Sequence, residues 1–292
     1  MSEFEDSLGN LLSRTNSLPA DKRLEFLQKS LLAIVPAEQQ AKAEVLIFLL
    51  AQVPATATEK IVVLIHGIRT NAEWQDRAAR VLAESAGFSV KPIKFGVLNL
   101  AKFWCPILTR VAPITNVLNE IRDIRAQFPT AEISVVAHSF GTYAIVKILQ
   151  KTPDVQIHRL LLCGAIVEKR LQWQMMPRFP TGGVLNLCGT KDVMPILAKI
   201  TTWGYGCTGR YGLGTNRVSD VFLDVTHSGF FADDCIKTYW VPFLLTGKVQ
   251  NSGAGRSATP LWIMFLSALP LQWLIALAAL WGACRLLYGF LG

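Results

Sequence analysis

The sequence lacks the residue patterns that mark several large functional classes. Its 292 residues include only four histidines, and no spacing of histidine, cysteine or carboxylate residues suggests a zinc or calcium site. None of the six cysteines stands in a C-x-x-C pair, so we expect buried thiols and no disulfide framework. The glycine-rich segment 203–217 does not match the G-x-x-x-x-G-K-[ST] phosphate loop. We therefore expect no metal and no other cofactor.

A secretory signal and a nucleic-acid motif are also missing. The first ten residues, "MSEFEDSLGN", are acidic and have no apolar run, unlike a signal peptide. The net charge of +8 lies mainly in residues 59–250, but no zinc finger or RNA-recognition signature accompanies it. We expect no nucleic-acid partner, and we interpret the basic surface as one that faces anionic lipid headgroups.

The C-terminal part is the most apolar stretch of the chain. A polar linker over residues 248–260 precedes an uncharged segment over residues 261–284. Such a segment would reach about 36 Å as a helix, against a hydrocarbon thickness of about 30 Å. The segment predicts a single-pass transmembrane anchor, with a re-entrant hairpin at Pro270 as the alternative. Lys248 and Arg256 precede it and Arg285 alone follows, which places the preceding domain on the cytoplasmic side of the membrane.

The N-terminal residues 1–57 predict a helical extension. Leu24, Leu27 and Leu31 recur on one face of the first helix, and a second amphipathic segment ends at Pro54. Two interpretations remain open at this point. The extension either packs on the main domain as a helical hairpin or serves as a docking module for a protein partner.

Residues 58–247 predict an α/β domain. Apolar, β-rich runs at 61–67, 88–96, 133–139, 157–167, 183–190 and 220–226 alternate with helical segments, including 71–87, 114–128 and 141–151. Short buried strands separated by helices are typical of a mostly parallel sheet with helices on both faces. The stretch 97–113 is ambiguous, because it suits either the lining of a site or a membrane contact.

Ser139 stands where a predicted strand turns into a helix, in "VVAHSFGTY". A nucleophile elbow reads G-x-S-x-G and needs small flanking residues, because strand and helix pass closely there. Gly141 meets this requirement, whereas Ala137 replaces the first glycine. Upstream, "LIHGIRT" ends another strand, where the backbone N–H groups of Ile68 and Phe140 would together stabilise an oxyanion. His66 is interpreted as a structural turn residue.

Two acids and one histidine follow Ser139 in the order that a serine nucleophile needs. Asp192 comes just after the strand in "LNLCGTKDVMP", and Asp224 in "FLDVTH" is the rival acid. His227 is the only histidine after Asp192, and it follows the last predicted strand. A hydroxyl nucleophile requires a general base and a group that orients that base.

The motifs "VVLIHGIRTNAEW", "VVAHSFGTY", "LCGTKDVMP" and "VTHSGFF" together resemble the α/β-hydrolase superfamily, in particular its lipase- and esterase-like serine hydrolases. The resemblance covers roughly residues 60–245. It implies an α/β-hydrolase fold with Ser139 as nucleophile, Asp192 as orienting acid and His227 as general base, and Ile68 and Phe140 as oxyanion donors.

The expected function is a membrane-anchored serine hydrolase that cleaves carboxylic esters or thioesters through an acyl-enzyme. Lipid esters are the leading substrate class, because the anchor would place the site beside a bilayer. Two alternatives stay open: an amidase or peptidase that uses the same residues, and a non-catalytic protein of the same fold that works through its N-terminal helices.

Overall fold

The computed structural model describes residues 20–31, 44–45, 47, 59–67, 73–93, 109–255, 260–262, 265 and 271–291. The chain divides into two compact units, Met1–Glu59 and Lys60–Gly292. In the first unit, helix α2 covers Ala20–Leu31 and buries Leu27, as the leucine spacing predicts. Most of the second predicted N-terminal helix lies outside the described residues. Whether this unit binds a partner therefore stays a prediction.

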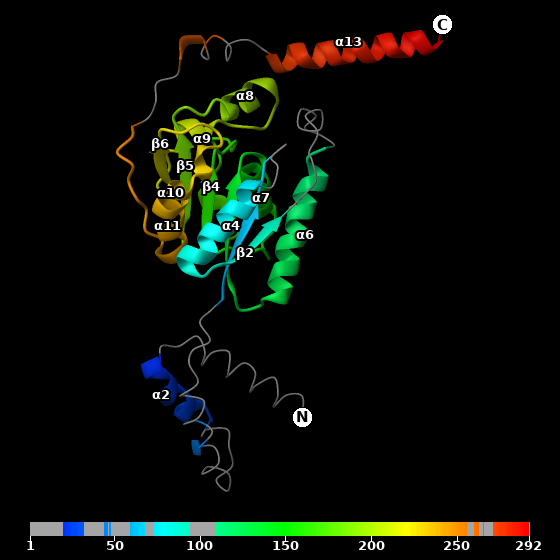
Figure 1. The fold of residues 1–292 in the computed structure, drawn as a ribbon. Helices are drawn as coiled ribbons and strands as arrows, with labels where there is room; N and C mark the ends of the chain where they lie inside the picture. The colour runs from blue at the N-terminus through cyan, green and yellow to red at the C-terminus, as the bar shows by residue number, and fades with distance from the viewer. Residues whose placement is uncertain are drawn as a thin grey trace. The chain divides into compact units, whose positions relative to one another are not determined.

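A six-stranded sheet forms the centre of the second unit, and all of its strand pairs are parallel (Figure 1). The strand order is β2-β1-β3-β4-β5-β6, so the chain runs outward from β1 first to one edge and then to the other. Each strand coincides with a run predicted from the sequence, although β1, β3 and β6 each begin one residue before the predicted run. The strands are β1 (Lys60–Ile65), β2 (Ser89–Ile93), β3 (Glu132–His138), β4 (Leu160–Cys163), β5 (Val184–Gly189) and β6 (Ser219–Leu223).

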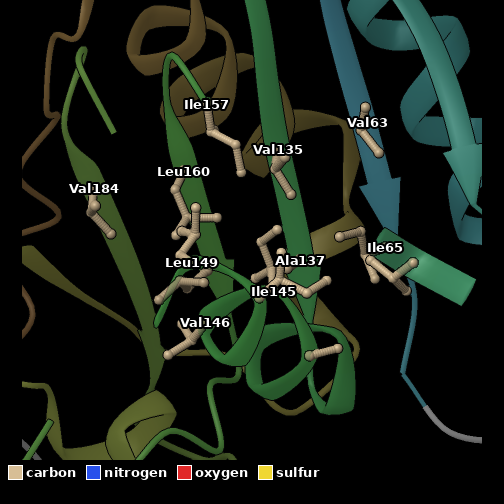
Figure 2. Close-up of a cluster of buried hydrophobic side chains, with 14 of the residues drawn as sticks. Val63, Ile65, Val135, Ala137, Ile145, Val146, Leu149, Ile157, Leu160 and Val184 are labelled. Atoms are coloured by element: carbon tan, nitrogen blue, oxygen red, sulfur yellow. The ribbon is translucent and has the colours of Figure 1, made fainter. Parts of the chain in front are cut away.

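Helices cover both faces of the sheet. Successive side chains of each strand point to opposite sides, so apolar strands present an apolar surface on both faces that helices bury. On one face, alternate residues such as Ile61, Val63 and Ile65 pack against α6 (Val111–Gln127) and α7 (Phe140–Lys151). Figure 2 shows part of this layer, with Val135 and Ala137 of β3 beside Ile145 of α7. The predicted parallel sheet with helices on both faces is thus confirmed, and it is consistent with an α/β-hydrolase fold.

The opposite face buries the intervening strand residues, such as Val62 and Leu64, beneath α4 (Glu73–Ala86) and the segment before residue 247. Trp240 is fully buried there and lies in a π-helical turn, Ile236–Trp240, that leads into α11. The remaining short elements are η2 (Trp173–Met175), α8 (Met194–Thr201), α9 (Thr208–Tyr211), η3 (Gly229–Phe231), α10 (Asp233–Cys235) and α11 (Val241–Thr246).

Helix α6 starts earlier than the sequence predicts. The expected helix began at residue 114, but α6 begins at Val111 and includes Pro113 in its first turn. Proline is tolerated in this position, because N–H groups of the first turn have no intrahelical partner. Most of the ambiguous stretch 97–113 lies outside the described residues.

The C-terminal helix α13 covers Leu271–Leu291. It begins directly after Pro270 and continues past Arg285, whereas the sequence predicted one span over residues 261–284. In the described parts of the chain, no helix combines the length and apolar content that crossing a bilayer requires. The transmembrane helix is therefore not confirmed.

Candidate functional site

Ser139 lies in a strained turn between β3 and α7. Its backbone has φ 52° and ψ −119°, and it is the one non-glycine residue with positive φ in the described part of the chain. An L-residue in such a conformation costs on the order of 1–3 kcal/mol, and strain of this kind concentrates at functional sites. The turn ends the strand at His138 and starts the helix at Phe140, as a nucleophile elbow does.

Two glycines let other backbone segments approach the elbow. A Cβ atom added to Gly141 would lie 2.6 Å from the carbonyl oxygen of Ile65 and 2.9 Å from that of His66. A Cβ atom at Gly67 would lie 2.7 Å from Ser139 Cβ and 3.2 Å from Ser139 Oγ. The end of β1 therefore lies directly against the serine, and any side chain at these two positions would push it away.

Asp192 and His227 form a hydrogen-bonded pair. Asp192 follows β5, is completely buried and accepts a hydrogen bond from His227 Nδ1 through its Oδ2 at 2.8 Å. The backbone N–H of Met194 donates to Asp192 Oδ1 at 2.9 Å, so both carboxylate oxygens are held. Because a carboxylate only accepts, Nδ1 carries the proton. This leaves Nε2 of His227 as the nitrogen that can take a proton from a nucleophile, and about a fifth of this side chain is exposed.

Asp224, the rival acid, lies elsewhere. Two-thirds of its side chain is exposed, and its carboxylate pairs with Lys191 Nζ at 2.8 Å and accepts from Thr190 Oγ1 at 3.1 Å. The hydrogen bond from Lys191 lowers the pKa of Asp224. The structure thus brings His227 together with Asp192 and leaves Asp224 in a surface ion pair.

Ser139 is connected to the Asp192–His227 pair through the end of β4. The backbone N–H of Ser139 donates to the carbonyl oxygen of Cys163 at 3.1 Å. The next residue, Gly164, has φ +55°, and a Cβ atom there would lie 2.9 Å from Asp192 Oδ2 and 3.0 Å from His227 Nδ1. Ser139 and the Asp192–His227 pair therefore lie at the same carboxyl end of the sheet, on either side of the end of β4.

His138 holds the loop that carries His227. It is almost fully buried, and its Nε2 lies 3.0 Å from the carbonyl oxygen of His227, to which it donates. The two rings lie 4.3 Å apart between centroids, at 46°. Burial, and then the neighbouring His227, hold the pKa of His138 well below its usual range. His138 is therefore neutral, with its proton on Nε2.

Of the two expected oxyanion donors, Phe140 lies within the described part of the chain. Phe140 is the first residue of α7 and is fully buried, so its backbone lies at the helix N-terminus next to Ser139. Ile68 lies outside the described residues. His66 is buried and its Nδ1 lies 2.5 Å from the carbonyl oxygen of Gly67, as expected of a turn histidine. Burial lowers the pKa of His66.

Sequence reasoning missed two positioning residues. His138 precedes the serine directly, but its partner is 89 residues away, so the motif gives no sign of the contact. Arg210 of α9 is buried and donates from Nη1 to the carbonyl oxygen of Asp192 at 3.1 Å. No local pattern around Arg210 points to Asp192. Only the adjacency of α9 and the turn after β5 brings them together.

No protein-family model and no curated protein matches this chain. Similar solved structures include TT1662 from Thermus thermophilus, which is 14% identical with a TM-score of 0.45 over 65% of this chain and 89% of that one. A Xanthomonas campestris structure, described as an a/b serine hydrolase without lid, is 17% identical with a TM-score of 0.41 over 66% and 83%. An alpha-beta serine hydrolase homologue from Coxiella burnetii is 14% identical with a TM-score of 0.43 over 65% and 86%.

Proposed function

We propose that this protein is a serine hydrolase that cleaves carboxylic esters or thioesters by acyl transfer. The observation that carries the proposal is the strained Ser139 turn beside a buried, hydrogen-bonded Asp192–His227 pair. A serine hydroxyl needs a base of this kind to become nucleophilic. The distant solved structures contribute nothing to this choice of chemistry.

The first half-reaction forms an acyl-enzyme. His227 Nε2 takes the proton of Ser139 as Oγ attacks the acyl carbonyl carbon, and Asp192 stabilises the imidazolium that results. Backbone N–H groups of Phe140 and Ile68 stabilise the negative oxygen of the tetrahedral intermediate. The intermediate collapses when His227 returns the proton to the leaving alkoxide or thiolate, which departs as an alcohol or a thiol.

The second half-reaction releases the acid. Water gives a proton to His227 Nε2 and attacks the acyl carbonyl, and a second tetrahedral intermediate forms. Its collapse breaks the bond to Ser139 Oγ, which recovers the proton from His227. Asp192 remains ionised throughout and keeps Nδ1 protonated, because it accepts the same hydrogen bond in both steps.

Fluorophosphonate labelling tests the nucleophile. The reagent forms a phosphorus–oxygen bond to an activated serine and releases fluoride, so the wild-type protein should label and Ser139→Ala should not. Ser219→Ala removes an exposed serine from β6 and serves as the matched control, which should label normally. Labelling that persists in Ser139→Ala would refute the assignment. A wild type that neither labels nor hydrolyses ester, thioester or amide substrates would favour the non-catalytic alternative.

We also propose that the C-terminal segment attaches the protein to a membrane, with the hydrolase domain on the cytoplasmic side and lipid esters as its substrates. Trp273, Leu277 and Trp281 of α13 are each more than half exposed, and such apolar surface is usually covered. A chain that ends at residue 255 should leave the membrane fraction. If it stays there, the C-terminal segment is not the attachment.

A further inference from the structure

A basic cavity of about 370 Å³ lies at the same carboxyl edge of the sheet as Ser139, between the loop after β4 and the helices α8 and α9. Three cationic side chains line it, Lys169, Arg170 and Lys199, against a single carboxylate, Glu168. None of these residues belongs to the proposed catalytic set. The excess of positive charge suits an anionic ligand.

The inner wall of the cavity supplies further polar groups. Tyr211 lines it, and the buried phenolic oxygen of Tyr211 forms no hydrogen bond within the described residues. Cys207 also lines it. Burial raises the pKa of the Cys207 thiol, whereas the charges of Lys199 and then Lys169 oppose this shift. The ammonium groups of Lys199 and Lys169 therefore both lie near Cys207, where they would also attract a bound anion.

The start of α13 packs beside this cavity. Leu271 joins a small apolar cluster with Ile196 and Ile200 of α8, and Cys207 and Tyr211 belong to the same cluster. The cavity wall and the start of α13 thus pack against the same two side chains of α8. A second contact follows directly, because the rings of Trp203 and Trp273 meet edge to face with centroids 5.3 Å apart.

The exposed side chains of α13 form an apolar stripe. They follow the spacing of one helical face, and each is between 53% and 65% exposed: Trp273, Leu274, Leu277, Leu280 and Trp281. Apolar surface of this extent on a helix usually marks a contact with another molecule or a membrane, because its exposure to water is unfavourable. The adjoining cationic cavity indicates a cover that carries negative charge beside apolar material.

We propose that the cavity binds the phosphate group of an anionic phospholipid while the α13 stripe enters the acyl layer of the same leaflet. This inference rests on the proposed membrane attachment and is independent of the proposed hydrolysis. Lysines attract a phosphate as point charges, and a lysine near an anionic surface contributes about 1 kcal/mol to binding. The cavity thus confers a preference for anionic lipid, and the stripe supplies attachment to any bilayer.

Vesicle flotation with the full chain tests the cavity. Wild type should bind phosphatidylcholine vesicles that contain phosphatidylglycerol more tightly than vesicles of phosphatidylcholine alone. Lys169→Gln/Lys199→Gln should lose this difference, by about ten-fold or more in partition coefficient, and keep its binding to neutral vesicles. The control Lys151→Gln/Lys237→Gln removes the same charge from exposed residues outside the cavity and should lose much less. Equal losses in both double variants would overturn the proposal.

A second pair of variants tests the stripe. Leu277→Gln/Leu280→Gln should weaken binding to neutral and anionic vesicles alike, whereas Val111→Gln/Val249→Gln, which alters exposed apolar residues elsewhere, should not. If the α13 variant instead turns a dimer into a monomer in sedimentation and binds vesicles normally, a second copy covers the stripe and the proposal is wrong.

Free phosphate compounds are the other source of the same chemistry. Titration calorimetry with glycerol phosphate measures binding without a bilayer. Saturable binding that Lys169→Gln/Lys199→Gln abolishes, together with unchanged vesicle binding, would identify a soluble ligand and overturn the lipid assignment. Fluorophosphonate labelling of the same variants should match wild type, so a failure here is distinguishable from a failure of the proposed chemistry.

Discussion

His138 donates a hydrogen bond from Nε2 to the carbonyl oxygen of His227 at 3.0 Å, and their rings lie 4.3 Å apart. The residue before the proposed nucleophile thereby fixes the backbone of the proposed general base. The buried imidazole of His138 thus joins two segments that lie far apart in the sequence. This contact links the folding of the last loop to the reactivity of the site.

Loss of this donor should slow the reaction without weakening substrate binding. In His138→Phe the ring remains, but the carbonyl of His227 loses its partner, and a small displacement of a catalytic group costs between about ten- and a hundred-fold in kcat. KM should change little, because the His138 side chain is almost fully buried. Steady-state kinetics on the best ester substrate measure the split.

His158→Phe is the matched control for this prediction. His158 is the histidine outside the site, and its Nδ1 lies 3.0 Å from Thr181 Oγ1. The His158→Phe variant should lower stability at most modestly and leave kcat unchanged. If His138→Phe lowers only the thermal midpoint and not kcat, its role is structural and the positioning argument fails.

Acid should destabilise the protein partly through His138. Burial lowers its pKa from the ordinary 6.5, so the unfolded chain binds a proton that the folded protein excludes. Stability from this group is fully present above pH 6.5 and falls as the pH drops from there toward the folded pKa, by at most about 1.4 kcal/mol per pH unit. Urea unfolding at about pH 7 and about pH 5, on either side of the unfolded pKa of 6.5, should show a larger loss of stability for wild type than for His138→Phe. Parallel slopes would contradict the assignment.

The two acids should differ sharply on substitution. Asp192→Asn would remove the charge that stabilises the imidazolium and favour the wrong tautomer of His227, which costs on the order of 10⁴-fold in kcat in comparable triads. Asp224→Asn breaks an exposed ion pair with Lys191, which contributes little to stability because water screens it. Its kcat should stay near wild type. The reverse order of effects would exchange the two roles.

The inner strands could be predicted from the sequence because they are apolar runs such as Ile61–Ile65, buried on both faces. The edge strands β2 and β6 are only partly buried and were recognised by their place between helical segments. The positions of Asp192 and His227 followed from chain order once the strands were placed. Chain order alone did not decide between Asp192 and Asp224, because only packing determines which of the two acids is buried. The contacts of His138 and Arg210 were also out of reach, since each joins segments distant in sequence. The membrane helix predicted over 261–284 stays a prediction, because apolar composition alone does not set where a helix begins, and α13 covers Leu271–Leu291.

An exchange of glycine and alanine should destabilise the protein at both small residues of the elbow, but for different reasons. In Gly141→Ala the new methyl group would meet the backbone carbonyls of Ile65 and His66 at 2.6 and 2.9 Å. Because backbone atoms yield poorly, the change should cost about 1–3 kcal/mol of stability and lower kcat through displacement of Ser139. Ala137 already lies in regular strand, fully buried, between Ile65 and Leu162. In Ala137→Gly, a buried methyl group is lost and chain entropy increases, which together cost about 1–2 kcal/mol with no gain in kcat. Thermal unfolding and kinetics of both variants measure this. A rise in turnover for Ala137→Gly would show that alanine at this position restrains the elbow.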